Sequence, residues 1–333
     1  MEIQDKKIRF AVIGTNFITD WVITGGLQDE RFCLTAVYSR TAEQAERFAA
    51  KYGIPYTFTS LDELADSPHV DAVYVASPNC MHASQCIRMM EKGKQVLCEK
   101  PLASNAREVK EMFEVARKNR VVLMEAMKPT LTPNFLAVRD NLHKIGTVRR
   151  YFSCYCQYSS RYDKFRDGVV LNAFNPELSN GALMDIGVYT IYPMVVLFGR
   201  PDTIQASGVK LSSGVDGEGS IVFGYKDMDA VVLYSKIANS TLPTEIQGED
   251  GTIRLDRINI IGNVCLTYRC GGGEDLTCPA DKNEYFYEIK EFIDLVESGK
   301  LESEINSHEH SLLTMEIMDE VRRQLGVVYP ADS

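Results

Sequence analysis

The sequence has no excess of basic residues. Its 333 residues include 46 Asp and Glu against 36 Lys and Arg, which gives a formal net charge of −10. Proteins that bind nucleic acids or anionic membranes need a basic surface, so this balance argues against both partners. It does not exclude one local basic pocket for a phosphate. Apolar residues make up 45% and charged residues 25%, which is typical of a globular protein, and the length predicts two domains.

Paired cysteine motifs are also missing. The chain has nine cysteines, an odd number, and none of them forms a CxxC pair. Cys154 and Cys156 are two residues apart and would share one face of a strand. We interpret all nine as reduced thiols, which excludes a disulfide framework and a cysteine zinc site. They are Cys33, Cys80, Cys86, Cys98, Cys154, Cys156, Cys265, Cys270 and Cys278.

No signal peptide is expected, because the charged segment from Met1 to Lys7 leads directly into a short apolar run. One apolar stretch is almost long enough to be a membrane-spanning helix. Gly181–Gly199 carries a single charge, Asp185, and approaches the length of a spanning helix. It also contains Gly187 and Pro193, and the sequence has no second stretch of this kind. We therefore expect a buried helix in a soluble, cytoplasmic protein.

Strand-like and helix-like stretches alternate in the first third of the chain. This alternation predicts an α/β domain with a doubly wound parallel sheet over residues 1–126. The expected strands cover 8–13, 32–38, 71–76, 95–98 and 121–124, and the expected helices cover 41–52, 81–92 and 104–119.

The pattern changes after about Glu125. Short strands separated by Gly, Asp and Asn turns follow one another from 203 to 268 with no helices between them, which predicts a large, mostly antiparallel sheet. We expect an α+β domain over residues 127–333, joined to the first by a change of topology rather than by a flexible tether. Its other expected elements are helices at 133–143, from 180, at 284–298 and at 307–325, and a β stretch at 147–159.

The first strand ends in a loop where a dinucleotide-binding protein carries G-x-G-x-x-G/A. The loop reads Gly14-Thr15-Asn16-Phe17-Ile18-Thr19. The first glycine of that motif allows the tight turn, and the second lets the backbone approach the pyrophosphate. Asn16 replaces the second glycine, which is tolerable because Asn enters left-handed conformations more readily than most residues. A plain turn from strand to helix is the alternative.

The second strand ends in Tyr38-Ser39-Arg40-Thr41, without the Asp or Glu that bonds the ribose hydroxyls in NAD-specific proteins. Neither the Ser39 hydroxyl nor the Arg40 guanidinium would repel the 2′-phosphate of NADP. The two parallel N–H donors of an arginine can also bind such a phosphate. This end of the strand therefore favours NADP. A solvated turn is the alternative.

Four further segments carry a resemblance to a known family. They are Ala76-Ser77-Pro78-Asn79-Cys80-Met81-His82 after the expected strand at 71–76, Glu99-Lys100-Pro101 after the one at 95–98, Ser160-Arg161-Tyr162-Asp163-Lys164-Phe165-Arg166, and Gly181-Ala182-Leu183-Met184-Asp185-Ile186-Gly187-Val188-Tyr189. With these segments the chain resembles the Gfo/Idh/MocA oxidoreductase family from Ile8 to about Tyr329. It most resembles the branch with dimeric dihydrodiol dehydrogenases and NADP-dependent D-xylose dehydrogenases.

The resemblance implies a Rossmann domain, followed by a domain with a large open-faced sheet that usually carries the oligomer contact. It implies that Lys100 and Tyr189 face the nicotinamide, with Asp185 beside them and Glu99 beneath the ribose. Together with the two loops above, the expected cofactor-binding residues are Gly14, Thr15, Asn16, Phe17, Ile18, Ser39, Arg40, Ser77, Pro78, Asn79, His82, Glu99 and Lys100.

The chemistry of the residues agrees with Lys100, Asp185 and Tyr189 as the catalytic group. Asp185 and Tyr189 are four residues apart and share one face of a helix. An unpaired buried carboxylate is costly, so Asp185 needs a partner, and Lys100 is the natural candidate. An ammonium near a phenol favours the phenolate, so Tyr189 can take the hydroxyl proton of an alcohol as hydride leaves its carbon. In the alternative, Asp185 caps a backbone group and Tyr189 belongs to the core.

Two prolines bear on this geometry. Pro101 pushes Lys100 into an extended conformation at the tip of its strand. Family members often have this Lys-Pro bond cis, and the sequence does not decide it. Pro193 cannot donate to the carbonyl of Tyr189, so we hypothesise a kink there that helps to aim the phenol.

Other positions depart from the family or admit a second interpretation. Thr130 stands where an Arg is common, which puts the contact of that Arg in doubt. His82 could be a residue of a helix start with no ligand role. His308 and His310 resemble a metal pair, but no third ligand is near, so we expect a solvated helix start and no metal.

We therefore predict an NADP-preferring oxidoreductase that transfers a hydride between nicotinamide and a secondary alcohol or carbonyl of a sugar, polyol or cyclic diol. One alternative is an NAD-linked inositol or sugar dehydrogenase. Another is a non-catalytic protein that senses a dinucleotide. We expect a homodimer or tetramer formed through the antiparallel sheet. The residues expected to contact substrate are Arg161, Tyr162, Phe165 and Asn172.

Overall fold

The computed structural model describes residues 7–333, so most of the segment that bears on a signal peptide lies outside the described residues. The chain divides into two compact units. The first contains the described residues up to Ala103 together with 107–128 and 281–308. The second contains 104–106, 129–280 and 309–333.

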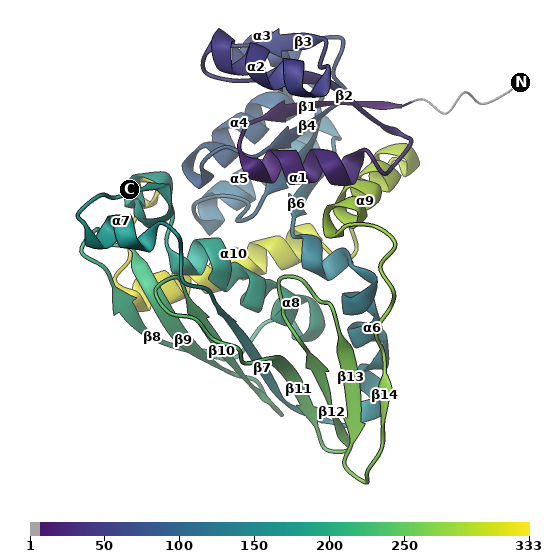
Figure 1. Ribbon diagram of the computed structural model, residues 1–333, viewed down its shortest axis with the longest axis vertical. Coiled ribbons are helices and arrows are strands. Elements are labelled where there is room, and N and C mark those ends of the chain that lie inside the picture. Colours follow the sequence, from purple (N-terminus) through teal and green to yellow (C-terminus); the bar gives the residue numbers. More distant parts are fainter. Residues whose placement is uncertain (1–6) are drawn as a thin grey trace, which may run out of the picture. The chain divides into compact units, whose positions relative to one another are not determined.

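The first unit is built on a six-stranded parallel sheet in the order β3-β2-β1-β4-β5-β6 (Figure 1). This sheet confirms the predicted doubly wound α/β fold. The strands are β1 (Ile8–Ile13), β2 (Phe32–Tyr38), β3 (Tyr56–Phe58), β4 (Ala72–Val75), β5 (Gln95–Glu99) and β6 (Leu123–Ala126). The helices are α1 (Phe17–Gly26), α2 (Ala42–Tyr52), α3 (Leu61–Asp66), α4 (Asn79–Glu91), α5 (Ala106–Asn119) and α9 (Glu284–Ser298).

Helix α9 is where the structure departs from the predicted domains. We expected everything after residue 126 to form the second domain, but 281–308 belongs to the first unit. Phe292 of α9 packs on Phe10 of β1 with ring centroids 5.7 Å apart. Arg31 binds Asp294 at 2.8 Å and Glu297 at 2.7 Å. These ion-pair partners are 263 and 266 residues apart in the chain, so no local sequence pattern reveals them.

The second unit is built on an eight-stranded sheet in the order β14-β13-β12-β11-β7-β10-β9-β8. Neighbouring strands are antiparallel except for β7 and β10, which confirms the mostly antiparallel sheet. The strands are β7 (Val148–Cys156), β8 (Thr203–Lys210), β9 (Asp216–Gly224), β10 (Asp229–Ser235), β11 (Thr244–Gly248), β12 (Gly251–Leu255), β13 (Val264–Tyr268) and β14 (Gly273–Asp275). The helices of four or more residues are α6 (Pro133–Asn141), α7 (Tyr162–Arg166), α8 (Val188–Phe198), α10 (His308–Leu325), the π-helical turn η5 (Leu183–Gly187), and the 3-10 turns η1 (Lys128–Leu131) and η2 (Leu142–Ile145).

The apolar stretch packs into the second unit. Among residues 7–333, one helical segment, Pro176–Phe198, is long and apolar enough to cross a membrane, and 72% of its most apolar window is buried. It ends in η5 and α8. The backbone carbonyl of Thr190 in α8 accepts a hydrogen bond of 3.0 Å from the hydroxyl of Tyr151 in β7. This burial is what a core helix requires.

The sheet of the second unit has two different faces. Side chains that point towards α8, such as Phe223 of β9 and Val232 of β10, are fully buried. Their neighbours in sequence point the other way, and Val222 is 45% exposed. We call the side of the sheet opposite α8 the outer face. It carries apolar side chains that no helix of this unit covers.

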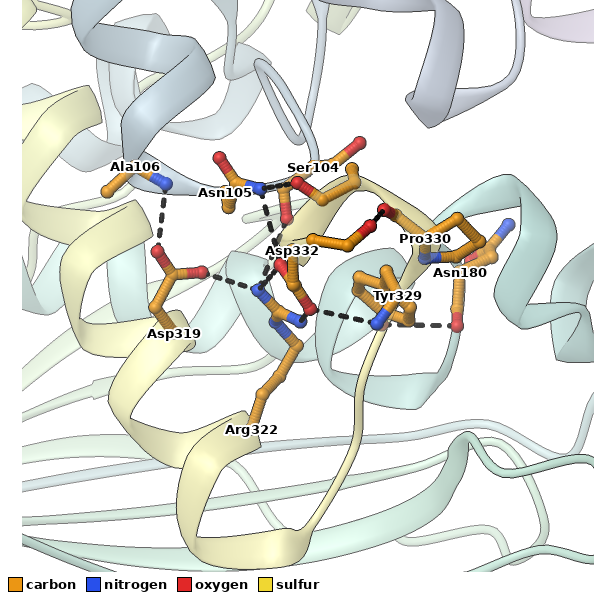
Figure 2. Close-up of polar contacts among 11 residues, drawn as sticks. Ser104, Asn105, Ala106, Asn180, Asp319, Arg322, Tyr329, Pro330 and Asp332 are labelled. Atoms are coloured by element: carbon orange, nitrogen blue, oxygen red, sulfur yellow. Dashed lines mark hydrogen bonds and ion pairs between the residues drawn. The ribbon is translucent and has the colours of Figure 1, made fainter.

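A buried arginine fixes the end of the chain in the second unit (Figure 2). The guanidinium of Arg322 in α10 donates to Asp319 and to Asp332, each at 2.7 Å. It also lies 4.4 Å from the ring centroid of Tyr329. The second oxygen of Asp319 accepts from the backbone N–H of Ala106 at 2.8 Å. One side chain therefore joins α10, residues 104–106 and the C-terminal turn.

We expect Arg322→Met to lower the free energy of unfolding strongly. Removing one partner of a buried ion pair leaves carboxylates without a counter-charge, which costs about 3–5 kcal/mol. The side chains of Asp319 and Asp332 keep 29% and 24% exposure, so we expect the lower end, about 3 kcal/mol. Urea denaturation followed by circular dichroism measures the loss.

Arg323→Met is the matched control. Arg323 is the next residue on α10, and its guanidinium pairs with Glu320 at the surface. Exposed ion pairs contribute little to stability, so the free energy of unfolding of this variant should be close to that of the wild type. An equal loss of unfolding free energy in both variants would show that the buried ion pairs of Arg322 stabilise the protein no more than the exposed pair of Arg323.

Candidate active site

The loops after β1 and β4 are in close contact at the carboxyl edge of the first sheet. Gly14 adopts φ +105, and a Cβ there would lie 2.5 Å from the carbonyl oxygen of Ala76. The side-chain amide of Asn16 donates to the same carbonyl at 2.9 Å. Its oxygen accepts from the backbone N–H groups of Ile18 and Thr19, which caps α1. Strand order reverses between β1 and β4, which is where doubly wound sheets bind ligands.

Two threonines stabilise the loop after β1, which lacks the second and third glycines of the G-x-G-x-x-G motif. The Thr19 side chain is buried, and its hydroxyl donates to the Gly14 carbonyl at 3.1 Å, so it stabilises the turn from within. The Thr15 hydroxyl accepts from the amide of Gln44 in α2 at 2.9 Å. Sequence reasoning missed Gln44, because a partly buried glutamine within a helix gives no signal of a contact with a distant loop.

Ser39 and Arg40 follow β2 at the same edge of the sheet. The backbone N–H of Ser39 donates to the carbonyl of Phe58 at 3.1 Å, which fixes the turn. Arg40 is exposed. Thr41 caps α2 by accepting from the backbone N–H of Gln44. Arg40 therefore lies two residues before the first residue of α2, and a helix N-terminus suits an anionic group.

His82 braces the ends of β4 and β5. Its Nε2 lies 2.9 Å from the carbonyl oxygen of Ser77 and its Nδ1 lies 3.0 Å from that of Pro101. Burial lowers the pKa of this imidazole, and its hydrogen bonds to the two carbonyls oppose the shift. Both ring nitrogens contact backbone carbonyls, which favours the interpretation that His82 has no ligand role and stabilises the structure. Ser77, Pro78 and Asn79 lie at the start of α4, where the Ser77 hydroxyl donates to Gln85 at 2.7 Å.

Glu99 and Lys100 stand at the carboxyl end of β5. The hydroxyl of the buried Tyr74 donates to the Glu99 carboxylate, and the second carboxylate oxygen accepts from the backbone N–H of Lys100 at 3.2 Å. Burial raises the pKa of the Glu99 carboxyl, against the opposing charge of Lys100. The bond between Lys100 and Pro101 is cis.

The residues at this edge fit a dinucleotide. Only glycine suits position 14, because a side chain there would meet the backbone of Ala76. The N-terminus of α1 begins directly after Asn16, where backbone N–H groups favour a pyrophosphate. No acidic residue lies between Tyr38 and Ala42 to repel a phosphate on the adenosine ribose. Of the predicted cofactor residues, the structure brings the Gly14–Ile18 loop together with Ser77 through Asn16 and Ala76.

The second unit holds a cluster that includes two of the three predicted catalytic residues. Asp185 lies on the π-helical turn η5 and forms an ion pair with Lys236, the first residue after β10. The Lys236 side chain is 4% exposed and the Asp185 side chain 34%. The Lys236 ammonium also lies 5.6 Å from the ring centroid of Phe174. Asp185 therefore has the buried cationic partner that its chemistry requires.

Sequence reasoning missed Lys236. We named Lys100 as the candidate partner of Asp185, and that pairing stays a prediction. The available signal was the sequence Tyr234-Ser235-Lys236 at the end of an apolar strand, since a lysine there is held close to the sheet. That signal does not distinguish a buried lysine from a solvated one.

Tyr189 is the second residue of α8. Its ring contacts Tyr155 of β7 edge-on, with centroids 5.8 Å apart. Pro193 lies inside α8, so the carbonyl of Tyr189 lacks its usual helical donor. The irregularity that the structure shows comes earlier, in the π-helical turn with Asp185. A kink at Pro193 that aims the phenol stays a prediction.

The predicted substrate residues separate into two groups. The rings of Tyr162 and Phe165 stack 6.0 Å apart, and both pack on Phe174 at 5.7 and 5.3 Å. This aromatic group adjoins Lys236 through Phe174. Arg161 and Asn172 are exposed at the starts of short helices.

The remaining predictions concern Thr130 and the histidine pair. Thr130 is fully buried in η1, so its side chain belongs to the core. We expected a solvated helix start at His308, but the residue is buried, and its ring stacks on Phe113 at 4.0 Å. Its Nε2 lies 3.0 Å from the carbonyl oxygen of Leu123. Among residues 7–333 no three His, Cys, Asp or Glu side chains gather in a metal-binding arrangement.

Comparisons with known proteins identify the family. Residues 8–127 match the oxidoreductase family with an NAD-binding Rossmann fold, and residues 141–254 match the GFO/IDH/MocA C-terminal domain. The scyllo-inositol 2-dehydrogenase (NADP(+)) IolU of Bacillus subtilis (strain 168) is 56% identical over 325 residues, which is 98% of this chain and 99% of that protein.

More distant relatives are also oxidoreductases. The trans-1,2-dihydrobenzene-1,2-diol dehydrogenase of Danio rerio is 33% identical over 326 residues, which is 92% of this chain and 93% of that protein. The solved structure of KijD10, a 3-ketoreductase from Actinomadura kijaniata in complex with TDP-benzene and NADP, has a TM-score of 0.80 and 25% identity and covers 96% of this chain and 98% of that one. The chain belongs to the Gfo/Idh/MocA family, as its motifs indicated, and it is an NAD(P)-dependent oxidoreductase.

Proposed function

We propose that the protein is an NADP-preferring dehydrogenase of a cyclic polyol. The coarser function is established by the family and its relatives: a hydride passes between nicotinamide and a CH–OH group, or its carbonyl, of a sugar, polyol or cyclic diol. The observation that carries the finer proposal is the end of β2. Ser39 and Arg40 offer a hydroxyl and a guanidinium with no neighbouring acid. The 56% identity to an NADP-linked inositol dehydrogenase supports both the cofactor and the substrate class.

We assign the proton transfer to Tyr189. When NADP is bound, its nicotinamide supplies or accepts the hydride. The phenol oxygen of Tyr189 takes the proton of the substrate hydroxyl during oxidation and returns it during reduction. The T-shaped contact with Tyr155 supports this role, because it holds the ring in one orientation.

Asp185 and Lys236 bind substrate hydroxyls in this proposal. Their ion pair places a carboxylate that is one-third exposed beside a nearly buried ammonium, so the acceptor is held in position. A polyol offers hydroxyl donors to such a carboxylate. The rings of Tyr162, Phe165 and Phe174 supply a flat apolar surface for the C–H face of a cyclic substrate. We assign Lys100 a second polar contact with the reacting oxygen.

A substrate panel tests the proposed function. Purified protein is assayed with NADP and NAD against scyllo-inositol, myo-inositol, D-xylose, levoglucosan and a trans-dihydrodiol, by nicotinamide absorbance. We expect the highest kcat/KM with NADP and an inositol. Faster turnover with NAD would favour the NAD-linked alternative. A kcat/KM for D-xylose, levoglucosan or the trans-dihydrodiol above that for both inositols would overturn the cyclic-polyol substrate class.

We propose that the protein associates through the outer face of the eight-stranded sheet. Apolar residues such as Val222, which is 45% exposed, lie on this face without a covering helix. Light scattering at micromolar concentration should show a dimer or tetramer, and Val222→Glu should shift the population towards the monomer because it places a charge in the contact. A wild-type monomer would contradict the proposal.

We also propose that the protein works in the cytoplasm. Its nine cysteines all lie in the described part of the chain, and none of them forms a disulfide. Thiols in this number persist in a reducing compartment. A fluorescent fusion examined by microscopy or fractionation should stay with the cytosolic proteins.

A further inference from the structure

Two neighbouring residues at the start of β9 hold the two members of the Asp185–Lys236 pair. The Asp216 carboxylate accepts from the backbone N–H of Leu183, the first residue of η5, at 2.7 Å. The carbonyl of Gly217 accepts from the backbone N–H of Lys236 at 2.9 Å. Asp185 lies on η5 and pairs with Lys236. The first two residues of β9 therefore join the turn that carries the carboxylate to the residue that carries the ammonium.

Glycines on either side of Asp185 allow β9 and β10 to approach η5 closely. A Cβ at Gly181 would meet the second carboxylate oxygen of Asp216. A Cβ at Gly187, the last residue of η5, would lie 3.2 Å from the ring of Tyr234, a buried residue of β10. The turn is therefore held at its start by the carboxylate of Asp216 and at its end by the ring of Tyr234.

An aspartate at position 216 does not serve stability at neutral pH. Asp216 is 1% exposed, and burial raises the pKa of its carboxyl to about 6, although the hydrogen bond from Leu183 and the charge of Lys236 oppose the shift. In the unfolded chain the pKa of this carboxyl is about 3.9. Its contribution to the stability of the fold is therefore present below about pH 4 and is lost as the pH rises from about 4 to about 6. A residue that is kept despite this loss calls for another role.

The titratable groups that face Asp216 come from β10 and from the C-terminal segment. They are Tyr234, Lys236 and Tyr329. Burial raises the pKa of both phenols well above its usual value, so neither phenol ionises at neutral pH. The turn η5 itself carries Asp185, whose charge pairs with Lys236. The two phenols therefore do not account for a change in the cluster near pH 6.

We propose that Asp216 is a positioning residue for substrate binding, because its carboxylate fixes η5 and thereby holds Asp185 beside Lys236. This inference rests on the proposed function, in which the Asp185–Lys236 pair binds substrate hydroxyls. Asp216 acts through the backbone N–H of Leu183 and touches neither substrate nor cofactor. When that hydrogen bond is lost, the turn relaxes and the Asp185 carboxylate is no longer held in one position. Affinity for the substrate then falls, while affinity for NADP does not change.

Two substitutions separate the hydrogen bond of Asp216 from its charge. Asp216→Ala removes both, and Asp216→Asn keeps a carbonyl oxygen that can accept from Leu183. With scyllo-inositol and NADP, Asp216→Ala should raise KM by about tenfold or more, as the loss of one charge-assisted hydrogen bond does, and change kcat less. The KM of Asp216→Asn should lie between those of Asp216→Ala and the wild type. Asp227→Asn is the matched control, because Asp227 is exposed in the turn of the same β9–β10 hairpin. An unchanged KM in Asp216→Ala would overturn the proposal.

The pH dependence of KM gives a readout that a merely structural role would not change. In the wild type, KM should rise as the pH falls through about 6, because a protonated carboxyl is a weaker acceptor for the Leu183 N–H than a carboxylate. In acid the wild-type KM should approach that of Asp216→Asn. The amide of this variant does not titrate, so its KM should show no step. A step of the same size in Asp216→Asn would assign the titration to another group and overturn the proposal.

Hydrogen–deuterium exchange tests the turn without requiring turnover. Mass spectrometry of peptic peptides that cover 181–187 should show faster exchange in Asp216→Ala than in the wild type, and nearly wild-type exchange in Asp216→Asn and Asp227→Asn. Unchanged exchange in Asp216→Ala would show that the carboxylate does not hold η5, which overturns the proposal. If Asp216→Ala does not fold, the pH dependence of Asp216→Asn decides. If the wild type turns over no inositol, the proposed function fails, and the exchange result still decides whether Asp216 holds the turn.

Discussion

Replacing Tyr189 by Phe is expected to lower turnover by about 10²- to 10⁴-fold, the usual contribution of a general acid or base. The ring and its contact with Tyr155 remain, so affinity for NADP should stay at the wild-type value. Steady-state kinetics with the preferred substrate and a fluorescence titration with NADPH separate the two quantities. A fall in both would show that the phenol holds the cofactor.

Tyr192→Phe is the matched control, because it makes the same change on the same helix. The Tyr192 hydroxyl is buried against Ser311 at 2.9 Å. Losing that hydrogen bond should cost about 1 kcal/mol of stability and leave turnover unchanged. If Tyr189→Phe retains wild-type turnover, Tyr189 is not the proton acceptor, and Lys100 becomes the candidate.

The second large effect concerns the cofactor, for which Arg40→Ala is expected to weaken NADP binding by about 10- to 150-fold. A charge-assisted hydrogen bond to a phosphate contributes about 1.5–3 kcal/mol, and each 1.4 kcal/mol corresponds to tenfold in affinity. Affinity for NAD should hardly change, because NAD has no 2′-phosphate. Titrations of both cofactors by fluorescence or calorimetry measure the two constants.

Arg40→Lys is the control for charge. It keeps the positive charge but loses the paired N–H donors of the guanidinium, so its affinity for NADP should lie between those of the wild type and Arg40→Ala. The difference between wild type and variant should shrink as salt rises, since Arg40 is exposed. Equal losses for NADP and NAD would show that Arg40 acts on the loop and not on the phosphate.

The elements that the sequence predicted well are those defined by local signals. Helix α9 covers Glu284–Ser298 as expected, because Asn283 caps its start and Gly299 ends it in the left-handed conformation. The short strand β3 was missed, since its three residues are too few to show a pattern. The assignment of α9 to the first unit was also missed, because it depends on packing against Phe10.

The same distinction holds at the candidate site. Gly14, Lys100 and Asp185 are recognisable because each belongs to a motif with fixed spacing. Lys236 has no motif, and its role depends on the turn η5 placing a carboxylate beside the end of β10. His82 lies in α4, and its contacts with two carbonyls depend on the paths of both strand ends.

The parallel pairing of β7 with β10 has a consequence for folding. Strands β8 to β10 form one antiparallel meander, and β11 to β14 form another, each from neighbouring stretches of chain. Strand β7 precedes both in sequence and lies between them in the sheet, so its pairing has a far higher contact order than that of either meander. Each meander can assemble locally before β7 joins them. Amide hydrogen exchange in β7 should therefore report completion of the whole sheet, while the edge strands β8 and β14 open at lower free energy.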